Sequence, residues 1–424
     1  MSLTQRLKTL VGFVVERRAW SHRFAILTVS QGLRIVNAFG ILPLLSRSTT
    51  REEFGQYVFA FSSSQFIALI CDFGLSSTAL RTLSRSDTQS LDRQLPLAFG
   101  IRALIGLAAT TLAMVACFFI FGNIPKGLFA MMFLGVCASQ SITWYLNATK
   151  RYSLILISEG LPVLLMFATT LLVLNCSLNI YTIFYAGGIG WLVPALIATF
   201  RRRRSSHARP SETSEPRLSA PLIDAGVGLS RIVGAIYSIG LIPLARITSG
   251  DGSIALYTAC EKLGSVAGVV ALVIAQLIAP HSARIAANSR ELAKLARVML
   301  VLEFGAGALY VAIFGGFGAR LVRIVFGPTY AHLNLGALLA ALAGVIAAAS
   351  TINWSGILVP AGRSSKVLAV SVVGALASMS VLFLLRNFGY IGIILARTAS
   401  ELAVLIPSLW VIVKLSRDRS PVGR

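Results

Sequence analysis

Ten charged side chains interrupt otherwise apolar stretches of this sequence, and they are the residues with the most chemistry to offer. The basic members are Arg34, Arg102, Arg231, Lys262 and Arg397, and the acidic members are Asp72, Glu159, Glu261, Glu303 and Glu401. A Lys or Arg at the centre of a bilayer costs about 2.5–3.5 kcal/mol on insertion scales. We therefore expect these residues to face a protein interior or a water-filled cavity, where they can bind an anion, carry a cation or pair with one another.

Arg34 and Arg231 are the strongest candidates for binding an anion. Each opens an Arg-Ile-Val triplet near the middle of an expected helix, so the two halves of the chain can present two guanidinium groups to one cavity. Guanidinium stays charged and donates bidentate hydrogen bonds to phosphate. Arg102 and Lys262 are further candidates, although both can also extend toward the membrane surface. The alternative is that these groups pair with acids and only hold helices together.

Two acidic residues are better explained as ion-pair partners. We expect Asp72 to be a buried partner of Arg34 or Arg81. Arg397 and Glu401 lie four residues apart, so they share one helix face and satisfy each other without a ligand.

Four other residues have candidate roles in transport. Glu261 and Glu303 are candidates for coupling, because acids within a membrane can carry protons or bind cations. Pro43 and Pro243 lie near the outer ends of expected helices, where proline removes a backbone hydrogen bond and can form a hinge. The alternative is that each proline simply ends its span. We expect no metal site and no cofactor.

The composition is that of a protein that crosses a membrane many times. Of the 424 residues, 56% are hydrophobic and only 13% charged, whereas soluble domains contain about 25% charged residues. At about 20 apolar residues per crossing, the chain accommodates about twelve helices. We expect them at 24–45, 54–80, 95–121, 127–148, 153–175, 180–200, 222–247, 254–280, 297–318, 333–360, 364–386 and 389–413.

The charge distribution indicates orientation and division into two lobes. The net charge of +22 first suggests nucleic acid, but the basic residues fall between apolar runs, most of them in loops on the side of the N-terminus. Both termini are therefore expected in the cytosol, and no nucleic-acid partner is expected. Residues 201–221 read as a basic cytosolic linker between six-helix lobes at 1–200 and 222–424. A faint repeat at a spacing of 200 supports this division.

Three motifs resemble those of polysaccharide biosynthesis (Wzx-type) flippases, a branch of the multidrug/oligosaccharidyl-lipid/polysaccharide flippase superfamily. They are Arg51 to Tyr57 with Asp72 to Leu75 and Arg81 to Arg85, then Leu321 to Tyr330, and Asn353 to Arg363. The resemblance implies an all-α polytopic fold with two six-helix lobes around a central cavity. It further implies a cargo of undecaprenyl-diphosphate-linked oligosaccharide, of O-antigen or exopolysaccharide type, moved from the cytosolic to the periplasmic leaflet of a bacterial inner membrane.

The partners implied are this lipid-linked sugar, membrane lipids, and a polysaccharide polymerase with its chain-length machinery. A cation-coupled multidrug exporter of the same superfamily is the main alternative. A membrane-embedded polymerase or ligase is less well supported, because every expected outer loop is short and no loop carries paired acids for acid–base chemistry. We therefore expect a transporter and not an enzyme.

Overall fold

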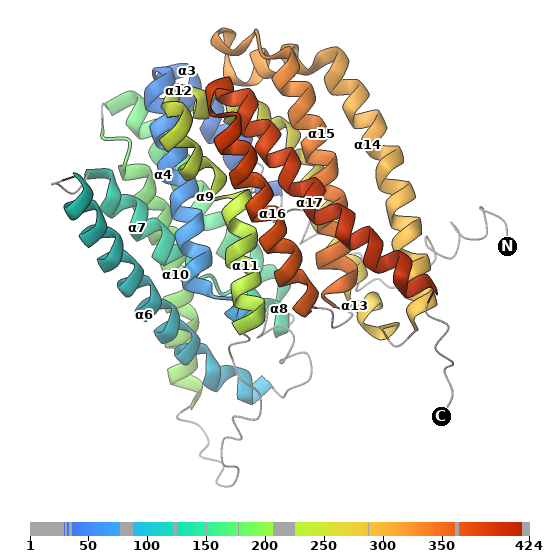
Figure 1. Cartoon of the computed structure of the whole chain (residues 1–424). Coiled ribbons are helices and arrows are strands. Elements are labelled where there is room, and N and C mark those ends of the chain that lie inside the picture. Colours follow the sequence, from blue (N-terminus) through green and yellow to red (C-terminus); the bar gives the residue numbers. More distant parts are fainter. Residues whose placement is uncertain are drawn as a thin grey trace.

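The computed structural model describes residues 29, 32–33, 36–76, 88–121, 126–149, 151–176, 178–206, 225–286, 288–360 and 364–417. Every regular element in these ranges is a helix, so the predicted all-α polytopic fold is confirmed. Ten helices of the described ranges are long and apolar enough to cross a membrane, and Leu368–Leu384 is a shorter apolar helix. Figure 1 shows the helices of the first half of the chain (blue to green) on one side and those of the second half (yellow to red) on the other.

The first half contains η1 (Asn37–Ile41), α3 (Leu42–Ser48), α4 (Arg51–Asp72), α6 (Thr88–Phe121), α7 (Lys126–Ser139), α8 (Thr143–Ala148), α9 (Tyr152–Cys176) and α10 (Thr182–Ser206). The second half contains α11 (Ala225–Ser238), α12 (Leu241–Gly264), α13 (Val266–Arg284), α14 (Ser289–Phe326), η2 (Pro328–Tyr330), α15 (Asn334–Thr351), η3 (Ile352–Leu358), α16 (Ser364–Leu384), η4 (Arg386–Phe388) and α17 (Gly389–Arg417). Part of the helix expected at 24–45 lies outside the described residues. The helix expected at 127–148 is broken between α7 and α8.

The seventh and eighth predicted helices meet at a tight turn inside α12. Gly250 has φ 73° and ψ 168°, a conformation that glycine adopts without the steric cost of a β-carbon. The chain reverses direction here, because Ser238 before the turn and Glu261 after it line the same cavity. The apolar stretch Gly228–Gly264 therefore belongs to two membrane crossings.

The two halves break at places that the 200-residue spacing relates. Helix α3 begins one residue before Pro43, and α12 begins two residues before Pro243. Proline is tolerated in the first turn of a helix, where its missing N–H has no helical partner to lose. Tyr57 and Tyr257, which the same spacing relates, are both buried. The role of the prolines as hinges stays a prediction.

One end of the bundle is closed by contacts between the halves, and we call it the sealed end. It consists of α3, the first turns of α4, the residues around Gly250 in α12, the end of α14 and η2. The Ser46 hydroxyl donates to the carbonyl of Phe326 (3.1 Å), and the Arg47 guanidinium donates to the carbonyls of Val325 (3.2 Å) and Ile324. Carbonyls in the last turn of a helix have no partner within it, so α3 supplies the missing donors for α14.

Close packing completes the sealed end. The ring of Phe54 lies against Phe326 and Tyr330, with centroids 6.5 and 6.4 Å away. A β-carbon on Gly55 would overlap the backbone carbonyl of Asp251, so this glycine allows α4 to approach α12. The largest buried apolar cluster runs through both halves here, whereas two further clusters each stay within one half. The halves are therefore joined most tightly at the sealed end.

Replacing Gly55 with alanine should lower the thermal stability of this arrangement. Overpacking a tight contact costs roughly 1–3 kcal/mol. The matched control is Gly305→Ala, because a β-carbon there meets nothing within 4 Å. That control should leave stability unchanged or raise it by up to about 1 kcal/mol through helix propensity. Thermal unfolding of the purified proteins in detergent measures both, and equal shifts for the two variants would contradict the close approach.

Candidate functional site

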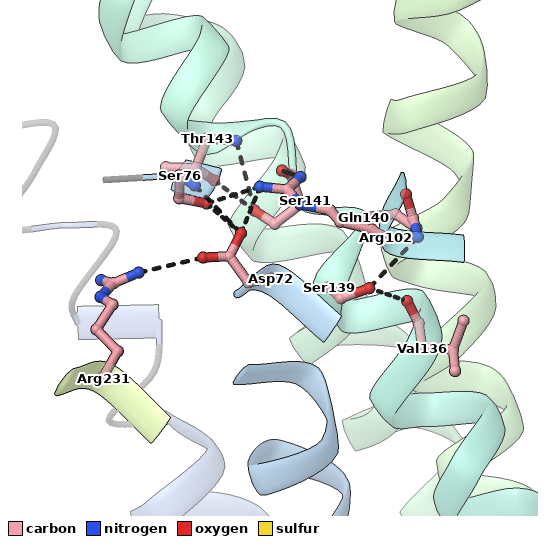
Figure 2. Close-up of polar contacts among 9 residues, drawn as sticks. All are labelled: Asp72, Ser76, Arg102, Val136, Ser139, Gln140, Ser141, Thr143 and Arg231. Atoms are coloured by element: carbon pink, nitrogen blue, oxygen red, sulfur yellow. Dashed lines mark hydrogen bonds and ion pairs between the residues drawn. The ribbon is translucent and has the colours of Figure 1, made fainter. Parts of the chain in front are cut away.

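A single carboxylate joins the two halves away from the sealed end. Asp72 is the last residue of α4, which ends because Phe73 adopts a left-handed conformation with φ 40°. One oxygen, Oδ1, accepts hydrogen bonds from Arg102 Nη2 (2.5 Å) and Ser76 Oγ (2.7 Å). The other, Oδ2, accepts from Arg231 Nη1 at 3.1 Å. Figure 2 shows Arg231 on one side of Asp72, Arg102 extending toward it from the other side, and Ser76 above it.

Arg102 is fixed inside the first half. Its side chain is 0% exposed, and it donates to the Ser76 hydroxyl (2.8 Å) and to the backbone carbonyl of Ser141 (3.3 Å). Ser141 lies in the break between α7 and α8, where the carbonyl has no regular helical partner. The guanidinium therefore balances Asp72 and satisfies the broken helix at once (Figure 2). The alternative that Arg102 extends to the membrane surface is wrong, because this side chain is completely enclosed.

Arg231 comes from the second half and is much more accessible. It lies on α11, and 45% of its side-chain surface is exposed, compared with 12% for Asp72. The neighbouring Gly228 allows the approach, since a β-carbon there would lie 2.6 Å from the carbonyl oxygen of Phe73. An arginine at this position can exchange partners without unfolding the helix that carries it.

The observed partners of Asp72 differ from those expected. Arg34 and Arg81 lie outside the described residues, and the pairs that the structure describes are with Arg102 and Arg231. The role of Arg34 as an anion ligand therefore stays a prediction.

A cavity of about 230 Å³ lies between the halves, on the sealed-end side of Asp72. Its lining from α4 includes Phe61, Ser62 and Gln65, and its lining from the second half includes Thr258 and Ser238. Gln65 precedes Asp72 by seven residues, and Ser238 follows Arg231 by the same number, a rise of about 10 Å along each helix. The ion pair thus stands about two helical turns from the cavity lining.

The charges that line this cavity are already paired. Lys262 Nζ lies 2.9 Å from a carboxylate oxygen of Glu261, and Arg397 lies 2.9 Å from Glu401. The second pair joins the two residues that the four-residue spacing places on one helix face. A smaller cavity of about 130 Å³ within the second half shares the wall formed by Tyr257, Glu261 and Arg397. The polar lining of the cavity between the halves is therefore continuous with that of the smaller cavity in the second half.

Two predicted acids lie away from the cavity. Both carboxylate oxygens of Glu303 on α14 are buried without a hydrogen-bond partner among the described residues. Glu303 lines neither cavity. Glu159 is buried on α9 and accepts a hydrogen bond from the Thr143 hydroxyl at 2.8 Å. A coupling role for Glu303 or Glu261 stays a prediction.

Sequence reasoning missed four polar residues of the site. Ser76 follows Asp72 by four residues, and the helix expected at 54–80 would have placed the two on one face, so this spacing was a usable signal. Gln65 and Thr258 line the cavity as isolated polar residues within apolar runs. Ser141 contributes its backbone carbonyl at a helix break that no glycine or proline marks, so the sequence carried no signal for it.

Comparisons with known proteins agree with this architecture. A family model described as polysaccharide biosynthesis protein matches residues 22–286. A comparison with curated proteins finds no match. The fold is similar to an inward-facing multidrug resistance MATE family transporter of the MOP superfamily, with a TM-score of 0.64 and 13% identity over 94% of this chain and 99% of that one.

Two further solved structures have similar folds. The lipid II flippase MurJ in an inward closed conformation gives a TM-score of 0.63 and 14% identity, over 93% of this chain and 89% of that one. A MOP superfamily transporter from Pyrococcus furiosus gives 0.60 and 15%, over 94% and 96%. At these identities the structures show the fold alone.

The unequal burial of the two arginines leads to a stability prediction. Arg102→Met should destabilise the protein by about 3–5 kcal/mol, because it removes the buried partner of Asp72. Arg231→Met should cost within about 1 kcal/mol, because its ion pair is half exposed. Denaturant or thermal unfolding in detergent measures both variants. Similar losses for the two would show that Arg102 is not the anchor of the site.

Proposed function

We propose that this chain, which belongs to the polysaccharide biosynthesis protein family, is a flippase for lipid-linked oligosaccharides. The resemblance seen in the sequence motifs is confirmed by this membership. The observation that carries the proposal is Arg231, a half-exposed guanidinium between the two halves of a transporter fold, close to a polar cavity. The cargo would be a polyprenyl diphosphate carrying an oligosaccharide repeat unit of O-antigen or exopolysaccharide type.

Each part of this cargo has a matching environment. The diphosphate would bind Arg231, joined by Arg34 from the first half, because arginine donates bidentate hydrogen bonds to phosphate oxygens. The sugars next to it would enter the cavity lined by Gln65, Thr258 and the Lys262–Glu261 pair, whose groups can exchange hydrogen bonds with hydroxyls. The polyprenyl tail would remain in the surrounding lipid.

Transport would proceed by alternating access. The excess of Lys and Arg on the N-terminal side assigns that side to the cytosol, and the sealed end to the periplasm of a bacterial inner membrane. The structure would then be closed toward the periplasm. Release would require the contacts of Ser46 and Arg47 with α14 to open, with hinges near Pro43 and Pro243. Glu261 and Glu303 are the candidates for coupling to a cation gradient.

A cation-coupled multidrug exporter is the second candidate, favoured by the similarity to MATE family transporters. Such a cargo is typically cationic, so free acids would be expected in the cavity. Glu261 and Glu401, which line the two cavities, are instead paired with Lys262 and Arg397. This pairing favours the flippase.

The test is the leaflet in which lipid-linked oligosaccharide accumulates in cells that lack this gene. We expect accumulation on the cytosolic side, relieved by the wild-type gene but not by the double variant Arg34→Ala with Arg231→Ala. Membrane insertion of the variant must be equal to wild type by quantitative immunoblot. The matched control is Arg246→Ala, which removes an arginine of the sealed end and should still relieve the accumulation.

Other outcomes have distinct meanings. An unchanged transbilayer distribution after deletion, in cells without another flippase, would rule out the flippase, and drug export would be assayed next. Full relief of the accumulation by the double arginine variant would leave the flippase proposal standing. It would show that the two arginines do not bind the cargo and have a structural role.

A further inference from the structure

We infer that Asp72 makes this site selective for diphosphate over singly charged phosphate headgroups, by competing with them for Arg231. The inference rests on the proposed function and adds a specificity-determining residue to it. It addresses a problem that any such protein faces, since the cytosolic leaflet is rich in anionic lipids that would otherwise occupy an accessible arginine.

The two carboxylate oxygens of Asp72 have different arginine partners, Arg102, which is fixed, and Arg231, which can exchange. Oδ1 faces Arg102 and Ser76, which are held within the first half by the contacts described above. Oδ2 faces only Arg231 among the contacts that the structure describes. Arg231 belongs to the other half and is 45% exposed, whereas Arg102 is fully buried. The two oxygens therefore have separate tasks.

Losing Arg231 leaves Asp72 satisfied. The carboxylate keeps its ion pair with Arg102 and its hydrogen bond from Ser76, so no buried charge is left without a partner. Breaking a buried ion pair completely is strongly destabilising, but breaking a half-exposed one costs little. An incoming anion therefore has to exceed only the modest attraction between Asp72 Oδ2 and Arg231.

This competition favours anions with more charge. A headgroup with one negative charge gives Arg231 about the same charge and acceptor oxygens as the Asp72 carboxylate. Its binding energy therefore exceeds the lost ion pair by little. A diphosphate carries more negative charge and more acceptor oxygens, which strengthens its charge-assisted hydrogen bonds to the guanidinium. Arg231 is thus neutralised while the site is empty and becomes available only to the more highly charged headgroup.

Binding measurements with the full-length protein in nanodiscs of uncharged lipid test this role. The probes are a polyprenyl diphosphosugar and the polyprenyl phosphosugar with the same chain length and sugar, which is a phosphodiester with one negative charge. We expect wild type to prefer the diphosphate by about tenfold or more in Kd. Asp72→Asn should reduce this preference to about threefold or less, mainly because the singly charged phosphosugar lipid now binds more tightly.

Three further variants separate competition from other effects. In an Arg231→Gln background, Asp72→Asn should change neither affinity, because there is no longer a guanidinium to compete for. The double variant Asp72→Asn with Arg102→Met should show the same relaxed selectivity without leaving Arg102 unpaired, which covers misfolding of the single variant. Asp251→Asn is the matched control, since Asp251 pairs with Arg246 at 2.8 Å at the sealed end, and it should keep the wild-type preference.

The possible failures are distinguishable. If Asp72→Asn, or the double variant, keeps the full preference for diphosphate, Asp72 does not set selectivity, although the flippase proposal stands. The same conclusion follows if Asp72→Asn tightens binding equally with and without Arg231, since the effect would then be general electrostatics. If wild type binds neither lipid, the proposed function itself is wrong, and the selectivity role falls with it.

Discussion

The architecture depends on the rule that a charge within a membrane needs a partner. Asp72 follows this rule and joins three separate pieces of the chain. They are α4 with Ser76, which follows the end of this helix, α6 with Arg102, and α11 with Arg231. Arg102 in turn satisfies the carbonyl freed by the break between α7 and α8. The bonds to Asp72 and to the Ser141 carbonyl therefore fix the relative positions of several helices.

Different interactions join the two halves at the two ends of their contact. The sealed end uses aromatic packing, a close backbone approach at Gly55 and hydrogen bonds to the last turn of α14. The other end uses the ion pair between Asp72 and Arg231, together with the approach of Gly228 to Phe73. A charged ligand can compete directly with an ion pair but not with apolar packing. An anion that binds Arg231 would therefore weaken the contact at one end and leave the apolar packing at the other end in place.

Sequence reasoning predicted the parts of this structure that depend on local pattern. Hydropathy predicted the helices, and the four-residue spacing predicted the Arg397–Glu401 pair. The pairing of Asp72 with Arg102 was not predictable, because it depends on how two helices are rotated against each other. Roles that need a ligand, such as those of Arg34 and Lys262, stay predictions.

The two halves have similar helix breaks but different positions of charged residues. Both have a helix break before a proline and a buried tyrosine at the same spacing, yet Leu272 occupies the place that corresponds to Asp72. The ion pairs described within the second half are local ones, formed by residues one to five positions apart. The first half instead directs one carboxylate oxygen across the boundary. Among the described residues, the ion pair that crosses between the halves is the one between Asp72 and Arg231, so a change in this bond is enough to alter the electrostatic contact between them.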